Sequence, residues 1–139
     1  MEIVKQPHVF LREGTNEIDI PISPDNEQLI ENMIKVMYEH NGVGLAANQI
    51  GYNRRIFVMD VSNERDKPQV FVNPVIKTKN NIKMGDNEGC LSCPGHEVKV
   101  SRSISVNLEW ICRHGKKGRK TFYHLPCRVI LHEMEHLDG

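Results

Sequence analysis

Leu131-His132-Glu133-Met134-Glu135-His136-Leu137 is the stretch around which we expect the rest of this chain to be organised. On a helix, residues four apart lie on one face with Cβ atoms roughly 5–6 Å apart, so His132 and His136 can hold one metal ion. Glu133 then reaches a water at that metal, which is the HExxH pattern of metal-assisted hydrolysis. The pattern also occurs by chance, and the alternative is a surface helix that carries two histidines.

A catalytic metal site of this kind needs a third protein ligand. Familiar HExxH proteases take that ligand from a residue downstream of the motif. Here only Asp138 and Gly139 follow the motif, so we expect the third ligand upstream. The four cysteines are better explained as metal ligands or core residues than as two disulfides, because a domain of this size does not need disulfides to fold.

Length and charge restrict the class of protein. The 139 residues predict one domain over residues 1–139, and 18 Lys and Arg balance 18 Asp and Glu. A neutral chain has no general electrostatic reason to bind DNA or an anionic membrane. No apolar run is long enough to span a bilayer, and the first residues lack the pattern of a signal or transit peptide, so we expect a cytoplasmic protein.

The first half of the chain predicts an irregular arm with a short strand over residues 1–22, followed by one long helix. Ser23 is the expected N-cap and Pro24 the first helical residue. Apolar residues then recur at helical spacing, and Gly42 is expected at the left-handed position that ends the helix. The segment 42–51 is rich in glycine and small apolar residues, but it lacks the strand and third glycine of a dinucleotide site.

The second half predicts strands and a terminal helix. Residues 55–61 and 70–77 look like strands, the alternation of apolar residues in 97–112 indicates one bent strand or two, and residues 120–125 return as a strand. Pro74 implies an edge or a bulge. Residues 78–87 are predicted to be turns, the basic run 113–120 to be a solvated hairpin tip, and Pro126 to open the last helix. We therefore expect an α+β fold, with mixed or antiparallel strands packed around the C-terminal HExxH helix and one further long helix near the N-terminus.

Three segments together resemble the peptide deformylase family. The family motifs GxGLAAxQ, EGCLS and HExxH followed by leucine correspond, in this order, to segments 42–49, 88–92 and 132–137. Each motif is weak alone, but three in order are specific. The resemblance covers the chain from the first helix to its end.

The resemblance implies a metal held by Cys90 as thiolate with His132 and His136, with an open position for water. Ferrous iron is the family's usual ion, and zinc, nickel or cobalt can replace it. Glu133 is implied as the general base and acid that removes the formyl group from formylated nascent peptides. The Gln49 amide and the Leu91 backbone N–H are implied to stabilise the negative charge on the formyl oxygen. Substrate contacts are implied for Gly42, Val43, Gly44, Gly89, Leu125, Arg128 and Val129.

The chain departs from the family pattern at several positions. Leu131 and Glu135 replace a common glutamine and aspartate, and Glu135 is expected to pair with Arg102. Arg128 stands where the methionine pocket is generally apolar. Most members also continue past this helix, so a naturally short form and a truncated chain are both compatible with the sequence.

Three alternatives stay open at this point. The first is a closed structural zinc site, with ligands Cys90, Cys93, His132 and His136. An inactive homologue that binds the ribosome through the basic run is the second, and an HExxH protease is the third. For the deformylase we expect a monomer with transient ribosome contact.

Overall fold

The computed structural model describes residue 3 and residues 14–80, 82–90 and 93–139. At residues 84, 86–90 and 93–100 it describes the backbone only. The arm over residues 1–22 was expected to contain a short strand. Residues 1–2 and 4–13 lie outside the described part, and residues 14–22 contain no strand. No helix in the described part is long and apolar enough to cross a membrane.

The first long helix, α2, spans Pro24–Glu39 and begins as the sequence predicts. The Ser23 side chain accepts a hydrogen bond from the Asn26 N–H at 3.2 Å, and Pro24 occupies the first helical position. The C-terminal prediction was wrong by one residue. Asn41, and not Gly42, has the left-handed backbone, with φ of 55°, because asparagine tolerates this conformation better than most residues with a side chain.

All strand pairings in the described part are antiparallel. One sheet has five strands in the order β1-β2-β3-β6-β7, and β4 and β5 form a separate pair. The elements are β1 Gly44–Ala46, the short 3-10 helix η1 Ala47–Ile50, β2 Ile56–Met59, β3 Gln69–Lys79, β4 Lys83–Cys90, β5 Cys93–Ser103, β6 Ser105–Ile111, β7 Lys117–Tyr123 and the last helix, α3 His124–Asp138.

Two strand predictions need correction or refinement. Residues 78–87 are not turns, because β3 continues to Lys79 and β4 begins at Lys83. Polar side chains hid these strands from the sequence pattern, whereas the backbone groups still pair along the β4–β5 ladder. Region 97–112 is two strands in two sheets, β5 and β6. The expected bulge at Pro74 is confirmed by a register shift between Val72 and Val75.

The last helix begins two residues earlier than predicted. His124, with φ of 55°, is its first residue, so Pro126 occupies the third position. Proline is tolerated there because the first four N–H groups of a helix have no partner within the helix. The basic run forms the β6–β7 turn and the start of β7, as expected of a hairpin, and Lys117 pairs with Glu109.

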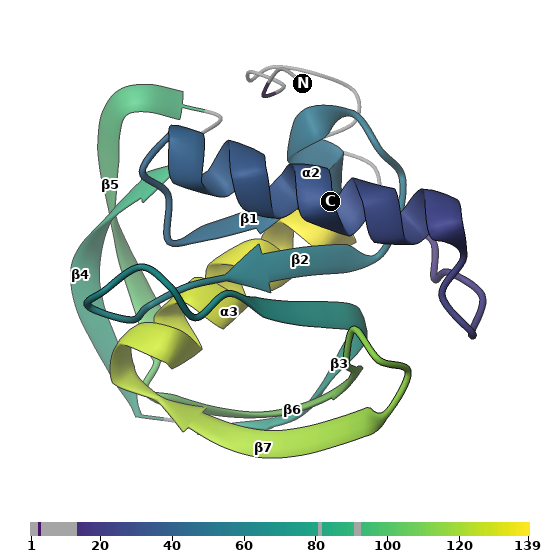
Figure 1. Cartoon of the computed structure of the whole chain (residues 1–139). Coiled ribbons are helices and arrows are strands. Elements are labelled where there is room, and N and C mark those ends of the chain that lie inside the picture. Colours follow the sequence, from purple (N-terminus) through teal and green to yellow (C-terminus); the bar gives the residue numbers. More distant parts are fainter. Residues whose placement is uncertain (1–2, 4–13, 81, 91–92) are drawn as a thin grey trace.

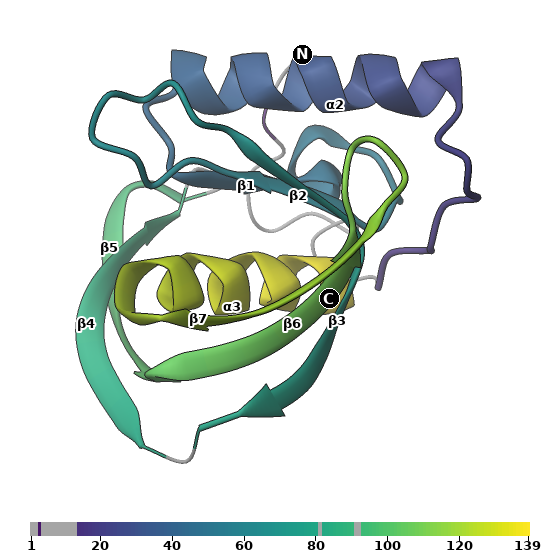
Figure 2. The same ribbon diagram turned by 60° about the horizontal axis from the view of Figure 1, so that its bottom comes forward.

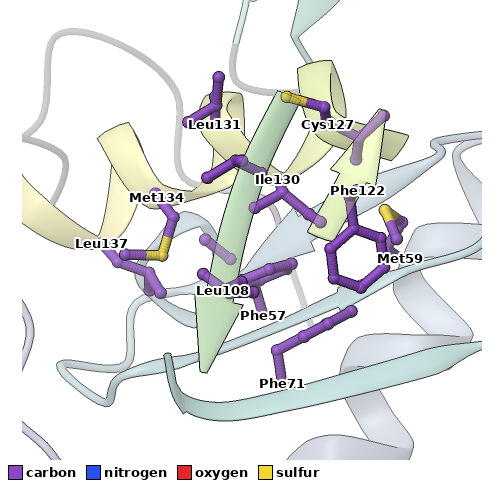
Figure 3. Close-up of a cluster of buried hydrophobic side chains, with 13 residues drawn as sticks. Phe57, Met59, Phe71, Leu108, Phe122, Cys127, Ile130, Leu131, Met134 and Leu137 are labelled. Atoms are coloured by element: carbon purple, nitrogen blue, oxygen red, sulfur yellow. The ribbon is translucent and has the colours of Figure 1, made fainter. Parts of the chain in front are cut away.

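The five-stranded sheet separates two apolar cores. β2 is buried on both faces: Phe57 and Met59 pack with α3, whereas Ile56 and Val58 pack with α2. In Figures 1 and 2, α2 lies over β1 and β2, while α3 lies on the other side, enclosed by the curved sheet and the β4–β5 pair. Figure 3 shows the α3-side core, in which Phe57 and Phe71 stack with ring centroids 4.5 Å apart. This arrangement confirms the α+β class with the HExxH helix at its centre.

Candidate active site

The two histidines of α3 face one point in space. The rings of His132 and His136 have centroids 4.9 Å apart, and their Nε2 atoms are separated by 3.2 Å. Two nitrogen ligands of one tetrahedral ion, each bonded at about 2.05 Å, lie about 3.3 Å apart. The spacing also permits a hydrogen bond between the rings in one tautomer. The pair therefore fits a shared divalent metal without rearrangement of the helix.

The expected third ligand and its neighbours lie at the end of β4. Cys90 is the last residue of this strand, and its backbone is paired with Cys93 after a register shift at Gly89. The side chains of Cys90 and Cys93, and all of Leu91, lie outside the described residues. Among the described residues, no group of three His, Cys, Asp or Glu side chains forms a metal site. The histidine pair is the part of the expected ligand set that the structure describes.

Glu133 is buried beside the first residue of β1. Its side chain is 4% exposed. A Cβ atom placed on Gly44 would lie 2.6 Å from Glu133 Oε2 and 2.8 Å from Val129 Cγ1. Such separations are far below van der Waals contact, so a larger residue here would displace the side chains of α3 or β1 itself. The backbone of β1 therefore forms one wall against the Glu133 carboxylate.

Gln49 is held in one orientation by the turn that contains it. It lies in η1, directly after β1, and is 1% exposed. Its Oε1 accepts a hydrogen bond from the Ala46 N–H at 2.9 Å. Because this contact uses the carbonyl end of the amide, the NH2 end of Gln49 is the end directed away from Ala46. The side chain can therefore act as a hydrogen-bond donor at the site.

Asn48 makes a contact that the sequence pattern did not predict. Its Nδ2 donates to the backbone carbonyl of His136 at 2.5 Å, and the side chain is 1% exposed. This bond joins the turn that contains Gln49 to the helical turn that contains the second histidine. The position lies inside GxGLAAxQ, but at the variable x, so the pattern carried no signal of its role.

The other expected substrate residues differ in exposure. Val43 and Leu125 are 42% and 53% exposed, whereas Gly42 and Val129 are buried and Arg128 is partly buried. On α3, Leu125, Arg128 and Val129 lie one and two turns before His132 on the same side of the helix. They therefore extend the histidine face toward the N-terminus of α3. Gly89 lies in β4, paired with Glu97.

The expected partner of Glu135 is confirmed. Arg102 of β5 contacts Glu135 in a bidentate pair, Nη1 to Oε1 at 2.6 Å and Nη2 to Oε2 at 3.2 Å. A cavity of about 570 Å³ lies next to this pair, with Leu131 and Met134 in its lining. No candidate metal ligand or catalytic residue lines it. The candidate catalytic residues lie on the other side of α3, which carries His132 and Glu133.

Comparison with known proteins gives one consistent result. The family model described as polypeptide deformylase matches residues 1–139. The peptide deformylase of Pelagibacter ubique is 39% identical over 139 residues, which cover 99% of this chain and 80% of the relative.

Solved structures agree with the sequence matches. A probable peptide deformylase from Synechococcus phage S-SSM7 superposes with a TM-score of 0.94 at 31% identity, covering 100% of this chain and 95% of that one. The Synechococcus elongatus peptide deformylase, solved in complex with actinonin, gives 0.95 at 32% identity, covering 100% and 76%. The chain belongs to the peptide deformylase family, whose members use a divalent metal to remove the N-formyl group from nascent peptides.

Proposed function

We propose that His132, His136 and the Cys90 thiolate hold the divalent metal of this deformylase, and that Glu133 is its general base and acid. The observation that carries the proposal is the 3.2 Å separation of the two histidine Nε2 atoms beside the buried Glu133. A thiolate and two imidazoles leave one of four tetrahedral positions open, as catalytic sites require. We propose ferrous iron as the native ion, with zinc, nickel or cobalt as substitutes, since this ligand set suits all four.

When bound, the metal supplies Lewis acidity and lowers the pKa of water at the site. Glu133 takes a proton from the attacking water, whose oxygen forms a bond with the formyl carbon. The carbon–nitrogen bond then breaks, and Glu133 delivers the proton to the departing amine. The products are formate and a free N-terminus, and Glu133 returns to its initial, deprotonated state.

Negative charge develops on the formyl oxygen during the attack. Gln49 is suited to stabilise it, because the bond from the Ala46 N–H to Oε1 leaves the NH2 end as the donor. The Leu91 backbone N–H is the second proposed donor. A single donor of this kind typically contributes about 3–4 kcal/mol to transition-state stabilisation.

The peptide is proposed to lie along Gly42, Val43 and Gly44, with Gly89 on the opposite strand. The exposed Val43 edge supports this placement. Leu125, Arg128 and Val129 are proposed to receive the methionine side chain, because they extend the histidine face of α3. Arg128 has a long aliphatic stem that can line an apolar pocket while its charged group stays at the surface.

The biological setting follows from the substrate. We propose one catalytic domain over residues 1–139 that acts as a monomer. We further propose that it works in the cytoplasm with transient contact to the ribosome, where formylated peptides emerge.

The direct test is formate release from a formyl-methionyl peptide, with the same peptide lacking the formyl group as control. Protein loaded separately with Fe²⁺, Zn²⁺, Ni²⁺ or Co²⁺ should release one formate for each new amino terminus. Fe²⁺ is expected to give the highest turnover under anaerobic conditions. Protein with a full metal complement that releases no formate would contradict the proposed function.

A further inference from the structure

A polar network lies behind the segment that is proposed to hold the peptide. Asp60 follows β2 and is completely buried. Its carboxylate accepts hydrogen bonds from the Tyr38 hydroxyl at 2.5 Å, the Ser62 hydroxyl at 2.6 Å and the Lys67 N–H at 3.1 Å. Two of these donors lie in the loop over residues 60–68, so the buried carboxylate folds this loop back on itself.

The charges of the network are fixed at neutral pH. Burial acts to raise the pKa of Asp60, but hydrogen bonds from Ser62, Tyr38 and Lys67 outweigh it and hold this pKa at about 2. Burial and the bond to Asp60 raise the pKa of Tyr38 to about 12, so the phenol keeps its proton and donates. Asp60 therefore remains an acceptor across the physiological range.

The folded loop directs Arg65 at the peptide-binding segment. Arg65 has a left-handed backbone, with φ of 57°, and its guanidinium lies 5.2 Å from the centre of the Tyr38 ring. Its Nη1 donates to the Asp60 carbonyl at 2.8 Å, and its Nη2 donates to the carbonyl of Gly42. One guanidinium thus joins the chain entering β1 to the chain leaving β2.

This bridge lies at the Gly44 end of the β1–β2 ladder, where Gly44 meets Glu133. The Asp60 N–H donates to the Val43 carbonyl at 2.9 Å, and the next ladder pair is Gly44 with Met59. In both Figure 1 and Figure 2, the β2–β3 loop lies beside the connection from α2 to β1. Gly44 itself packs directly against Glu133, so the residues available to move when the bridge is lost are Gly42 and Val43.

We propose that Arg65 is a positioning residue of the deformylase: by holding the Gly42 carbonyl, it fixes the 42–44 segment along which the peptide is proposed to lie. The inference rests on the proposed function and on the proposed role of that segment in peptide binding. Arg65 contacts no reacting atom in this account. Its effect should therefore depend on how much of the substrate lies along the segment.

The chain offers a matched control for this test. Arg54 also stacks on a tyrosine, 5.4 Å from the Tyr52 ring centre, and donates to Asn26 at 2.8 Å. That contact lies at the start of α2 and involves no residue of the candidate site. Arg65→Met and Arg54→Met remove the same charge and donors while keeping a long apolar stem.

The experiment compares a formyl-methionyl tripeptide with formyl-methionine amide as substrates for wild type, R65M and R54M. For R65M, kcat/KM for the tripeptide should fall about tenfold, mainly through KM, and the loss for the amide should be smaller. R54M should stay within about twofold of wild type on both substrates. If wild type is active and R65M has the same kcat/KM values as R54M, the inference is overturned while the proposed function stands. An equal loss of kcat/KM on both substrates in R65M also overturns it.

A second variant keeps the test decisive if R65M does not fold. Arg65→Lys keeps the charge but lacks the planar fork that reaches both carbonyls. An increase in its tripeptide KM of more than about twofold, with a smaller change for the amide, supports the inference. An R65K variant with both KM values unchanged overturns it. A wild-type protein that releases no formate rejects the proposed function itself.

Discussion

The two helices lie on opposite faces of one sheet and bury very different residues. The buried positions of α2 are all apolar: Leu29, Ile30, Met33, Val36 and Met37. Those of α3 include apolar residues and also Glu133, with partly buried His132 and His136 beside it. A buried carboxylate lowers stability unless it is compensated. Its presence in α3 and not in α2 therefore distinguishes the side of the sheet with the candidate site from the purely apolar side.

The two helices also differ in how a terminus is held. The N-terminus of α2 is capped by the residue just before it, Ser23. The C-terminus of α3 is held by residues distant in the sequence: Asn48 donates to the His136 carbonyl, and the Thr15 side chain donates to the Leu137 carbonyl at 2.8 Å. Arg55 pairs with Asp138 at 2.8 Å. The helix that carries the candidate ligands is therefore fixed by long-range polar contacts, which suits a group that must not move.

The largest expected effect on activity comes from replacing Glu133 on the α3 side of the sheet. Glu133→Ala should lower kcat by about 10²-fold or more, because the proposed proton carrier is lost. Metal content should stay near one ion per chain, measured by elemental analysis. Glu135→Ala is the matched control on the same helix, because its side chain is 69% exposed and pairs with Arg102. Loss of the metal together with activity would identify Glu133 as a ligand.

A smaller effect is expected from Gly44, which lies between the two helices. Gly44→Ala would place a methyl group 2.6 Å from Glu133 Oε2, so the carboxylate or β1 must move. We expect kcat/KM to fall about tenfold or more while the protein stays folded by circular dichroism. Gly14→Ala is the control, since the nearest atom to its Cβ among the described residues would be the Asp138 carbonyl oxygen, at 3.6 Å. Unchanged kinetics in G44A would mean that this contact does not restrain Glu133.

The smallest effect on turnover should come from the α2 side. Met33 is completely buried in the α2 core, so Met33→Ala should lower the free energy of unfolding by about 2–5 kcal/mol. Turnover of the folded fraction should stay near that of wild type, because none of the apolar residues that form this core is a candidate catalytic residue. Urea denaturation and a formate assay well below the melting temperature measure the two quantities. A large loss of turnover would show that the two sides of the sheet are coupled.

Local signals made much of this fold predictable. Ser23 and Pro24 predict where α2 begins, and the continuous apolar run around Phe57 predicts β2, because each depends on neighbours in the sequence. β4 was missed because its polar side chains carry no alternation, although its backbone pairs fully with β5. Strands of this kind are defined by their partner and not by their own residues.

In the candidate site, too, the residues predicted from the sequence are those brought together by local structure. His132, Glu133 and His136 were found because helical spacing alone brings them together. Asn48 and Arg65 were missed because each acts on a backbone carbonyl, 88 and 23 residues away in the sequence. A carbonyl acceptor has no residue type, so no sequence pattern marks such a contact. Arg102 and Glu135 were paired in advance only because both positions have counterparts in the family.

X-ray absorption at the metal edge tests the central claim most directly. The account predicts a first shell of one sulfur from Cys90, two nitrogens from His132 and His136, and an oxygen from water. Cys90→Ser should lose metal and activity together, whereas Cys93→Val should keep both. A shell with two sulfurs and two nitrogens in the resting protein has no open position for water. That result would contradict a deformylase centre and indicate a structural zinc site made of Cys90, Cys93, His132 and His136.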